Sequence, residues 1–589
     1  MSPPTQSAAT APPPSAGVSW RWWGAAGLLA VAGLVLGLVL GARNPNFGGD
    51  SLYYVFPVRN WLQGHGFAYQ GRPELLMPPG YGLLAMALSP LAANLEQACM
   101  AVSSLAFAAC IALACGIGRV CFRPAAGLWA GLFILLSPEI FRNSYIPLAD
   151  MSSCALYLLS LRLFLAAWRR GSHAGWSAAF GAAIAAAYLV RQEHFALALM
   201  ACGVLGLQAV LAGAGNPFRH PRRAVLDAWK RPAAALAAFL LVSFPYVLHL
   251  HTHTGRWTFS AKIGYNLAEA SGPAMGTQAF DLAVARDPAR YSAHNDEGLL
   301  DNLRRHGAEY AALVRVNSGG LVRCLQQFTY PALAAVALTA LAAAGLRRRR
   351  AAAGAAGPRT DWRVPFALFA APALLFLIFF IVNRLIMPYA MLLLIALGGL
   401  QGRLAGIMAA RLPARLAAAF PLLPVLGFLS FSAGYIPKLH VPLPVPRGAV
   451  TLFQGLRERH GHDGLRGAGL WLRDHAKVDA SLTVASPRKA AVMLFYAADF
   501  NDSPARAVDV PPDMDLAALP GWLASEQVDF FVLEHAYLHT RPALEPLWKD
   551  PAAGAALGLR SVHEVAGILV VFAVTPRTPP EPQPTTGTP

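Results

Sequence analysis

The chain has 589 residues, of which 56% are hydrophobic and 13% charged, whereas soluble domains carry about 25% charged residues. Its formal net charge is +17, but the arginines gather between long apolar runs, as the positive-inside rule requires of membrane proteins. This composition excludes an ordinary soluble protein and argues against nucleic acid as a partner. It predicts a polytopic membrane protein surrounded by membrane lipids.

Residues 1–19 are rich in Pro, Ser, Thr and Ala, so we predict a disordered cytoplasmic tail. The apolar run that follows is longer than the hydrophobic region of about 7–15 residues in a signal peptide, which favours a membrane span. Similar runs predict about eleven transmembrane helices in a mainly α-helical bundle. Their approximate bounds are 24–42, 96–118, 125–141, 147–167, 174–190, 194–212, 233–250, 328–346, 364–382, 385–401 and 416–434.

Basic residues are concentrated in alternate gaps between these runs, at 119–123, 169–170, 219–231, 347–359 and 403–415. Such gaps face the cytoplasm in membrane proteins. We therefore expect a multi-pass protein of the cell inner (plasma) membrane with a cytoplasmic N-terminus. Its transmembrane module, residues 20–434, would keep the long first loop, residues 43–95, on the extracytoplasmic side.

The segment 435–575 differs from the rest of the chain because charged residues become frequent in it. Short β-like runs at 481–485, 529–533 and 567–574 alternate with helix-like stretches at 467–476 and 516–526. This alternation predicts a small α/β domain, which the topology places in the periplasm. Residues 576–589 are rich in Pro and Thr and are predicted to be a disordered tail.

The first outer loop carries a stretch with helical spacing. Tyr54, Val58, Trp61 and Leu62 share one face, and Arg59 lies on another, which predicts an amphipathic helix in the membrane interface. Pro57 is expected to bend this helix or to split off its first turn. Asp50 precedes the helix, where it serves either as an N-cap or as a functional acid. The run 78–81, Pro-Pro-Gly-Tyr, is expected to turn the chain into the next apolar helix.

Asp150 lies at the outer end of a predicted span, where an ionised carboxylate needs a partner or a purpose. N-capping is again the structural alternative. Two acids on one side of a membrane can divide catalytic roles, one taking a proton and the other positioning a substrate.

Three cations also fall on the outer side in this topology: Arg191, Lys262 and Arg384. Arg191 breaks the positive-inside rule, so it either pairs with the nearby Glu193 or binds a phosphate. Together the three cations indicate an anionic ligand. The histidines at 249, 251 and 253 lack a carboxylate or cysteine at ligand spacing, so no metal site is predicted.

These outer-side segments resemble those of GT-C fold glycosyltransferases. The resemblance is closest to glycosyltransferase family 39 and the related Rgt-type and lipid A aminoarabinose transferases, and it covers residues 20–435. It rests on Asp50, Tyr54, Val58, Arg59, Leu62 and Gly64, on the run 78–81, on 137–139 and 147–150, on 189–193, on 262–267 and on 384–388. The chain departs from the family pattern at Ser51, Val58 and Gln192, and Ser51 leaves Asp50 as the single acid at that position.

The resemblance implies a polyprenyl-phosphate-linked sugar donor, a hydroxyl acceptor (lipid, glycan or protein) and an inverting transfer. It implies that Asp50 and Asp150 are catalytic and that the donor phosphate is bound by Arg191, Lys262 and Arg384. It further implies substrate contacts for Tyr54, Arg59, Tyr81 and Glu193. No cofactor is predicted, although a requirement for a divalent metal is left open.

Two other classes of function remain as alternatives to a glycosyltransferase. A secondary transporter would carry inverted repeats and ionisable residues near the bilayer midplane. A non-enzymatic envelope assembly protein would use its C-terminal domain to bind partners, and it would not depend on Asp50.

Overall fold

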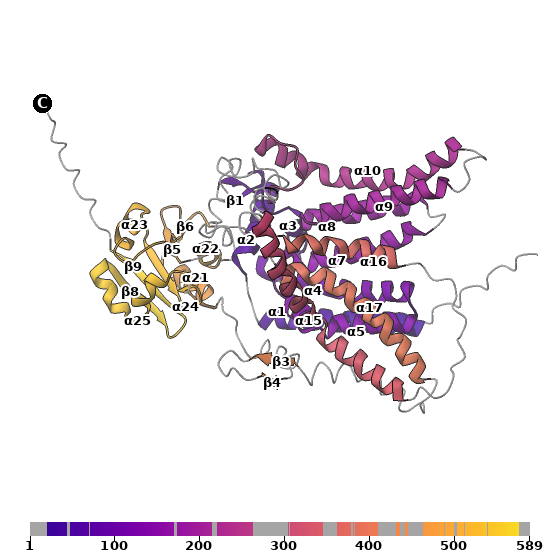
Figure 1. The fold of residues 1–589 in the computed structure, drawn as a ribbon. Coiled ribbons are helices and arrows are strands. Elements are labelled where there is room, and N and C mark those ends of the chain that lie inside the picture. Colours follow the sequence, from indigo (N-terminus) through magenta and orange to yellow (C-terminus); the bar gives the residue numbers. More distant parts are fainter. Residues whose placement is uncertain are drawn as a thin grey trace, which may run out of the picture.

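The structure is a computed structural model, and most of its helices form one bundle (Figure 1). The residues it describes are 20–43, 47–69, 71–169, 173–214, 221–262, 304, 307–345, 362–378, 381, 383–409, 432–435, 442–445, 463–487, 489–499, 503–511, 513–538 and 540–575. The predicted tails, residues 416–431 of the last predicted span and most of the gap between 251 and 327 lie outside them, and the end of that span, at 432–434, belongs to a strand and not to the predicted helix.

The bundle and the first loop contain the following elements up to residue 254: α1 (Trp20–Arg43), α2 (Gly49–Leu62), β1 (Ala68–Tyr69), β2 (Arg72–Pro73), α3 (Gly80–Leu88), the 3-10 turn η1 (Ser89–Leu91), α4 (Leu95–Cys121), α5 (Pro124–Leu135), α6 (Pro138–Asn143), α7 (Ala149–Trp168), α8 (Ala174–Val190), α9 (His194–Ala214) and α10 (Pro221–Thr254). It continues with α15 (Gly307–Gly345), α16 (Arg363–Ala370), the 3-10 helix η2 (Ala371–Leu377) and α17 (Asn383–Ala409), and a small hairpin follows in β3 (Ser432–Tyr435) and β4 (Pro442–Val445).

Every predicted span before residue 410 falls on a helix. Two of them are interrupted where a proline stands: α5 ends at Leu135 and α6 begins at Pro138, and α16 passes into η2 around Pro372. Proline lacks a backbone N–H, so it starts a new helix more readily than it continues one. The predicted continuous spans at 125–141 and 364–382 are therefore wrong in this detail.

Five described helices are long and apolar enough to cross a membrane, and five shorter apolar helices accompany them. The five long ones are Trp20–Arg43, Leu95–Cys121, Ala149–Trp168, Trp229–Thr254 and Asn383–Met408. Large apolar side chains such as Leu28 and Leu241 are exposed on the outside of the bundle, where lipid tails would cover them. The chain is thus a multi-pass membrane protein, and the count of about eleven spans stays a prediction.

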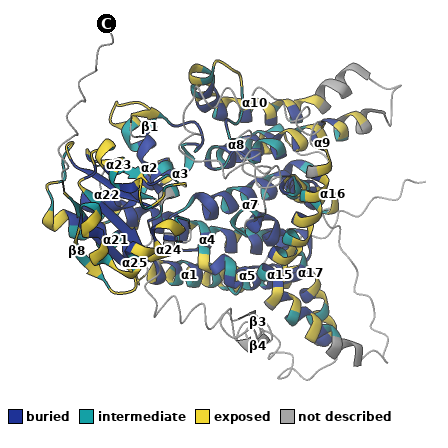
Figure 2. Ribbon diagram, turned by 60° about the vertical axis from the view of Figure 1, so that its left-hand side comes forward, coloured by how far each residue is buried: buried dark blue, intermediate teal, exposed yellow. Residues whose placement is uncertain are grey.

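Small residues let the helices approach one another closely. A side chain on Gly181 of α8 would meet the backbone of Ala235 in α10, so the backbones of these two helices are in direct contact here. The main hydrophobic core runs through α4, α5, α7, α8 and α17, which are dark blue in Figure 2, whereas α9 and α10 show more exposed residues.

The helix α2 of the first loop is more buried than predicted. Val58 is buried together with Tyr54, but Trp61 and Leu62, which were expected on the same face, are exposed. Pro57 lies inside the helix and does not split it. α2 packs against α3 on one side and against the C-terminal region on another. The predicted apolar face is therefore wrong, because its four residues divide between a buried and an exposed side, and the position of α2 in the membrane interface stays a prediction.

The contact between α2 and α3 depends on Gly82. An added Cβ at this position would lie 2.3 Å from the Tyr54 carbonyl oxygen and 2.5 Å from a Val58 methyl carbon. We expect Gly82→Ala to lower the free energy of unfolding by about 1–3 kcal/mol, because overpacking forces backbone shifts. Thermal unfolding in detergent measures this.

Gly116→Ala is a matched control, since Gly116 lies inside α4 with no atom within 4 Å of an added Cβ. Alanine there should leave the melting temperature unchanged or raise it, because it favours the helix. Equal melting temperatures for Gly82→Ala and the wild type would contradict the close α2–α3 contact.

The C-terminal strands form a five-stranded sheet in the order β6-β5-β7-β9-β8. β5 runs parallel to β6 and β7, while β9 runs antiparallel to β7 and β8. The elements of this region are α21 (Asp463–His475), β5 (Thr483–Ser486), α22 (Ala490–Ala497), β6 (Arg506–Asp509), α23 (Leu519–Ser525), β7 (Phe530–Glu534), α24 (His535–Leu538), η3 (Pro542–Leu544), α25 (Glu545–Lys549), η4 (Pro551–Leu557), β8 (Leu559–Val565) and β9 (Leu569–Val574).

Helices cover both faces of this sheet. Val532 of β7 belongs to a cluster with α21 and α22, whereas its neighbours Phe531 and Leu533 belong to a cluster with α23 and α25. This alternation follows from the two-residue period of a strand. The three predicted strands fall on β5, β7 and β9, while β6, β8 and α22 were not predicted. The cluster with α21 and α22 also includes residues of α2 and α3, so the sheet region packs against the first loop.

Candidate active site

Asp50 and Arg384 meet at the end of the bundle that faces the sheet region. Asp50 lies in the first turn of α2, and its Oδ2 accepts a hydrogen bond from Nη1 of Arg384 at 2.8 Å. Arg384 stands at the start of α17. The Asp50 side chain is 33% exposed and that of Arg384 40%, so a ligand can reach both.

Asp50 does not cap α2. The N-cap residue is Gly48, and no side chain satisfies the free N–H groups at this end. The capping alternative is therefore wrong. Burial raises the pKa of the Asp50 carboxyl, but the charges of Arg384, Lys489 and Lys262 outweigh it and hold the pKa below its ordinary value. Asp50 is thus ionised at neutral pH.

A second group of charges surrounds Arg191, in the turn between α8 and α9. Its guanidinium donates to Oδ1 of Asp150 and, from Nη2, to Oε1 of Glu193 at 3.3 Å. Asp150 is 3% exposed and Arg191 10%. The predicted pair with Glu193 is present, and the pair with Asp150 is an addition that the sequence did not indicate.

Asp150 lies in the first turn of α7, and its N-cap residue is Leu148. The capping alternative for Asp150 is therefore wrong as well, because its carboxylate faces Arg191. Burial raises the pKa of Glu193, but the charges of Arg191 and Lys262 lower it to about 2, so this carboxyl is ionised throughout the physiological range.

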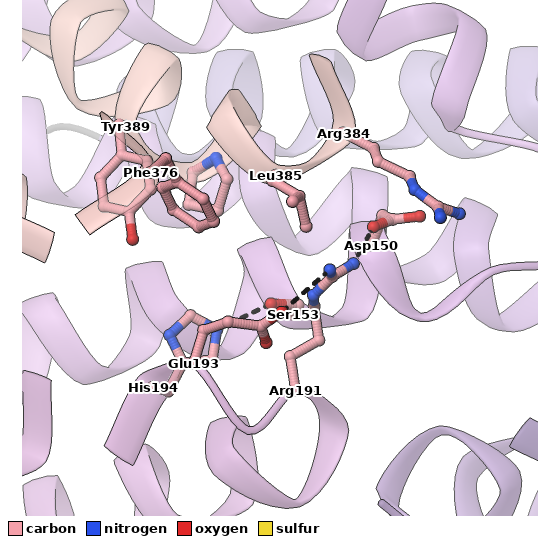
Figure 3. A pocket seen from close by; sticks show the side chains of 10 residues that line it. Asp150, Ser153, Arg191, Glu193, His194, Phe376, Arg384, Leu385 and Tyr389 are labelled. Carbon is pink, nitrogen blue, oxygen red and sulfur yellow. Dashed lines mark hydrogen bonds and ion pairs between the residues drawn. The ribbon is translucent and has the colours of Figure 1, made fainter. Parts of the chain in front are cut away.

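A small pocket lies between Arg384 and the Arg191 group (Figure 3), and Asp50 is beside it without lining it. Charged groups converge on one side of the pocket, and aromatic rings lie on the other, as Figure 3 shows. Its lining residues are Asp150, Ser153, Arg191, Glu193, His194, Phe376, Arg384, Leu385, Pro388 and Tyr389.

The other candidate residues lie around this pocket. The ammonium of Lys262 is close enough for the charges of Glu193, Arg191 and Asp50 to act on it, and burial lowers its pKa. Tyr54 and Tyr81 are buried with their rings in edge-to-face contact at 5.7 Å, and neither lines the pocket. The Tyr81 hydroxyl donates to the backbone carbonyl of Cys99.

Arg59 lies in the last turn of α2 and does not line the pocket. The substrate contacts predicted for Tyr54, Arg59 and Tyr81 therefore stay predictions.

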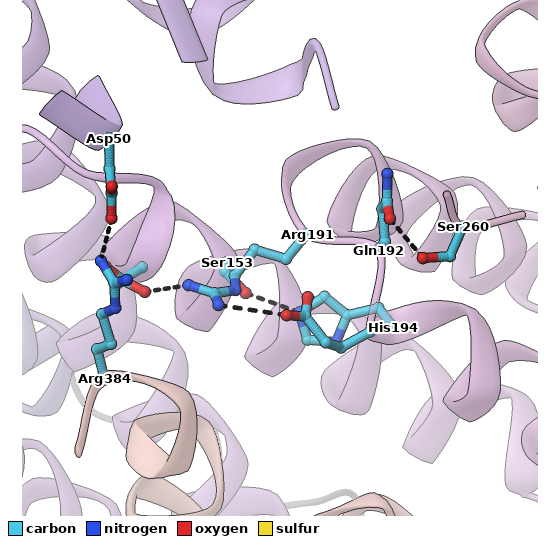
Figure 4. Close-up of polar contacts among 9 residues, drawn as sticks. Asp50, Ser153, Arg191, Gln192, His194, Ser260 and Arg384 are labelled. Carbon is cyan, nitrogen blue, oxygen red and sulfur yellow. Dashed lines mark hydrogen bonds and ion pairs between the residues drawn. The ribbon is translucent and has the colours of Figure 1, made fainter. Parts of the chain in front are cut away.

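The sequence did not point to several polar residues of the site (Figure 4). His194 shares a hydrogen bond of 2.7 Å with Ser153. Gln192 donates to the Tyr246 hydroxyl at 2.6 Å and accepts from Ser260 at 2.5 Å. Gln192 thereby ties the segment before Lys262 to the turn that carries Arg191. In the sequence, Gln192 stood out only because the glycosyltransferase families named above often have a proline at this position.

Among the described residues, no group of three or more His, Cys, Asp and Glu side chains is arranged to hold a metal ion. The ring of His249 lies 3.0 Å from the Glu74 carbonyl oxygen, and the ring of His251 stacks on Trp257. Both rings have structural contacts that do not involve a metal.

No protein-family model and no curated protein matches the sequence. The structure is similar to the crystal structure of ArnT from Cupriavidus metallidurans bound to undecaprenyl phosphate. That likeness has a TM-score of 0.55 and 15% sequence identity, and it covers 95% of this chain and 100% of the other. The structure is also similar to the crystal structure of the Archaeoglobus fulgidus oligosaccharyltransferase in complex with zinc and sulfate. There the TM-score is 0.50, the identity 13% and the coverage 93% of this chain and 73% of the other.

Both proteins are GT-C fold glycosyltransferases. At this level of identity the likeness concerns the fold, and it confirms the GT-C fold that the loop motifs predicted. The chain is a multi-pass membrane protein with the fold of these integral-membrane transferases.

Proposed function

We propose that the chain is a membrane glycosyltransferase. It moves a sugar from a polyprenyl-phosphate-linked donor to a hydroxyl of a lipid, glycan or protein acceptor, with inversion at the anomeric carbon. The observation that supports this most is that Arg384 and the Arg191 group line one and the same pocket, next to an ionised Asp50. A GT-C neighbour crystallised with undecaprenyl phosphate agrees with such a donor.

The proposed reaction transfers one proton and releases one leaving group. Asp50 takes the proton of the acceptor hydroxyl as general base. The acceptor oxygen attacks the anomeric carbon, and the bond between this carbon and the phosphate oxygen breaks. The polyprenyl phosphate leaves with one more negative charge than it had in the donor.

The ion pair between Asp50 and Arg384 suits this step. When Asp50 is protonated, its charge disappears, and the Arg384 guanidinium becomes available to the phosphate as the phosphate gains charge. Lys262 adds a second cation. Such fixed charges, aimed at the place where charge develops, are a large term in enzymatic rate enhancement.

Asp150 and Glu193 have a different part in this proposal. Both hold the guanidinium of Arg191, so Asp150 orients a phosphate-binding arginine from the pocket wall. The contact between Tyr54 of α2 and Tyr81 of α3 holds these two helices together, and Arg59 contacts substrate beyond the pocket. The site faces the extracytoplasmic side of the inner membrane, and the sheet region forms a periplasmic domain above it.

The test uses purified protein in liposomes with labelled undecaprenyl phosphate that carries mannose, galacturonic acid or aminoarabinose. We expect one donor to be consumed, with release of undecaprenyl phosphate and an acceptor product of inverted anomeric configuration in the NMR spectrum. Consumption of no donor with any acceptor class overturns the proposal. Solute flux without sugar transfer would favour a transporter instead.

Transfer is expected to continue in the presence of EDTA. Arg384 and Lys262 supply positive charge to the leaving phosphate, so the reaction does not need a divalent cation for this purpose. The measurement compares initial rates with EDTA and with added magnesium or manganese. A rate that EDTA abolishes and a metal restores would show that a metal carries part of this charge.

Arg384→Gln is expected to lower kcat by about 10²–10³-fold, the usual cost of losing one donor to a developing oxyanion. Without Arg384 the pKa of Asp50 rises, so the acidic limb of the kcat profile moves to higher pH. Arg384→Lys keeps the charge but not the planar guanidinium with its two donor groups, and it should restore part of the rate.

Arg403→Gln is the matched control, because it removes an exposed arginine farther along the same helix. Equal rates for both Gln variants would contradict the role of Arg384.

A further inference from the structure

The helix α22 of the sheet region lies directly against the start of α2. Phe47, which precedes α2, stacks on Phe495 of α22 with ring centroids 4.3 Å apart. Phe56 of α2 contacts the same ring edge-to-face at 6.0 Å. Phe47, Phe56 and Phe495 are all buried, so this contact excludes water.

A polar contact joins the same two parts of the chain. The Tyr496 hydroxyl donates to Oε1 of Glu96 at 2.8 Å and accepts a hydrogen bond from the Phe47 N–H at 3.4 Å. Tyr496 and Glu96 are both buried. Arg466 of α21 lies over the Tyr496 ring at 5.3 Å and has a nitrogen 3.9 Å from Glu96. One buried hydroxyl thus links α22, the first turn of α4 and the residue that leads into α2.

The first turn of α2 has no capping side chain of its own. Its N-cap, Gly48, offers no side chain, and the next residue is also a glycine. Such a helix start has N–H groups without helical partners, and the buried Ser51 in this turn donates to the Pro147 carbonyl at 2.7 Å. Asp50 lies in this turn, so its position depends on contacts made by the residues around it.

We infer that Tyr496 is a positioning residue: it holds Phe47 and thereby fixes the first turn of α2, with Asp50 opposite Arg384. This inference rests on the proposed function of Asp50. It gives the sheet region a part in catalysis, because α22 contacts the residue that leads into the turn of Asp50.

A second feature of α22 agrees with this. Lys489, which precedes the first residue of α22, has a left-handed backbone with φ of 64°. Its charge contributes to the low pKa of Asp50. The groups whose charges act on Asp50 therefore come from three places: Arg384 of α17, Lys262 after α10, and Lys489 before α22.

The test is Tyr496→Phe, which removes the hydroxyl and keeps the ring. Backbone amide hydrogen exchange of the segment 47–62 should become about fivefold faster, because the loss of one hydrogen bond lowers the local stability of this segment. In a transfer assay kcat should fall by about 10- to 100-fold with little change in the KM of the donor, because a displaced base slows the chemical step. The acidic limb of the kcat profile should move to higher pH as Asp50 moves away from its cations.

Tyr157→Phe is the matched control. It removes another buried hydroxyl, which donates to the Phe369 carbonyl within the bundle, and it should leave exchange of 47–62 unchanged. Unchanged exchange of this segment in Tyr496→Phe overturns the inference, whether or not the wild type transfers sugar. Faster exchange with wild-type kcat and pH profile also overturns it. A wild type that transfers no sugar refutes the proposed function instead, which the donor assay shows separately.

Discussion

Asp50→Asn is expected to lower kcat for sugar transfer by about 10²–10⁴-fold, the usual contribution of a general base. Asparagine has nearly the same shape and can still accept a hydrogen bond from Arg384, but it cannot take the acceptor proton. Because Asp50 and Arg384 are both partly exposed, the loss of their ion pair should change the melting temperature only slightly. Initial rates with the labelled lipid-linked donor, together with thermal unfolding of the same sample, measure both effects.

Asp474→Asn serves as the control for this change. Asp474 is an exposed carboxylate of α21 that pairs with the adjacent Arg473, and it lies outside the site. The control should transfer sugar at the wild-type rate. A folded Asp50→Asn protein with wild-type turnover would show that the base is another group.

Arg191→Met is expected to destabilise the protein by about 3–5 kcal/mol, the cost of removing one partner from a buried ion pair. The substitution removes the Arg191 guanidinium from Asp150, whose side chain is only 3% exposed. It also removes the ion-pair partner of Glu193. The measurement is the thermal midpoint in detergent. Arg142→Met, which removes an exposed arginine at the end of α6, should have little effect on this midpoint.

The double variant Arg191→Met with Asp150→Leu should regain part of the lost stability, because no buried charge then lacks its partner at that position. Its sugar transfer should stay low, since the arginine is gone. A single variant that keeps the wild-type midpoint but loses activity would instead mean that Arg191 contributes to phosphate binding alone.

The helices of the bundle were largely predictable from the sequence. A lipid surrounding requires that each spanning segment be apolar and satisfy its own backbone hydrogen bonds, so apolar runs identify helices directly. The strands β5, β7 and β9 were also recognisable as short apolar runs between polar turns. β6 and β8 were missed because most of their side chains are exposed or half-buried, which leaves little apolar pattern to read.

The candidate site was predictable in part. Single residues such as Asp50 and Arg384 drew attention because charges at the ends of spans are costly. Their pairing was not predictable, since 334 positions separate them and no local pattern links them. Local reasoning also suggested N-caps for Asp50 and Asp150, and tertiary ion pairs replaced both. The burial of α2 was missed because its cover comes from the sheet region, far along the chain.

The sequence separation between Asp50 and Arg384 bears on how the protein is made. Asp50 is synthesised early, with the first loop. Arg384 and then Tyr496 leave the ribosome more than 300 residues later. A chain that is still being inserted therefore has Asp50 and Lys262 but lacks Arg384, the residue that pairs with Asp50, and the contacts of α22. The biosynthetic consequence is that the proposed site is incomplete in a nascent or truncated chain, and it is assembled only when the sheet region packs against the first loop.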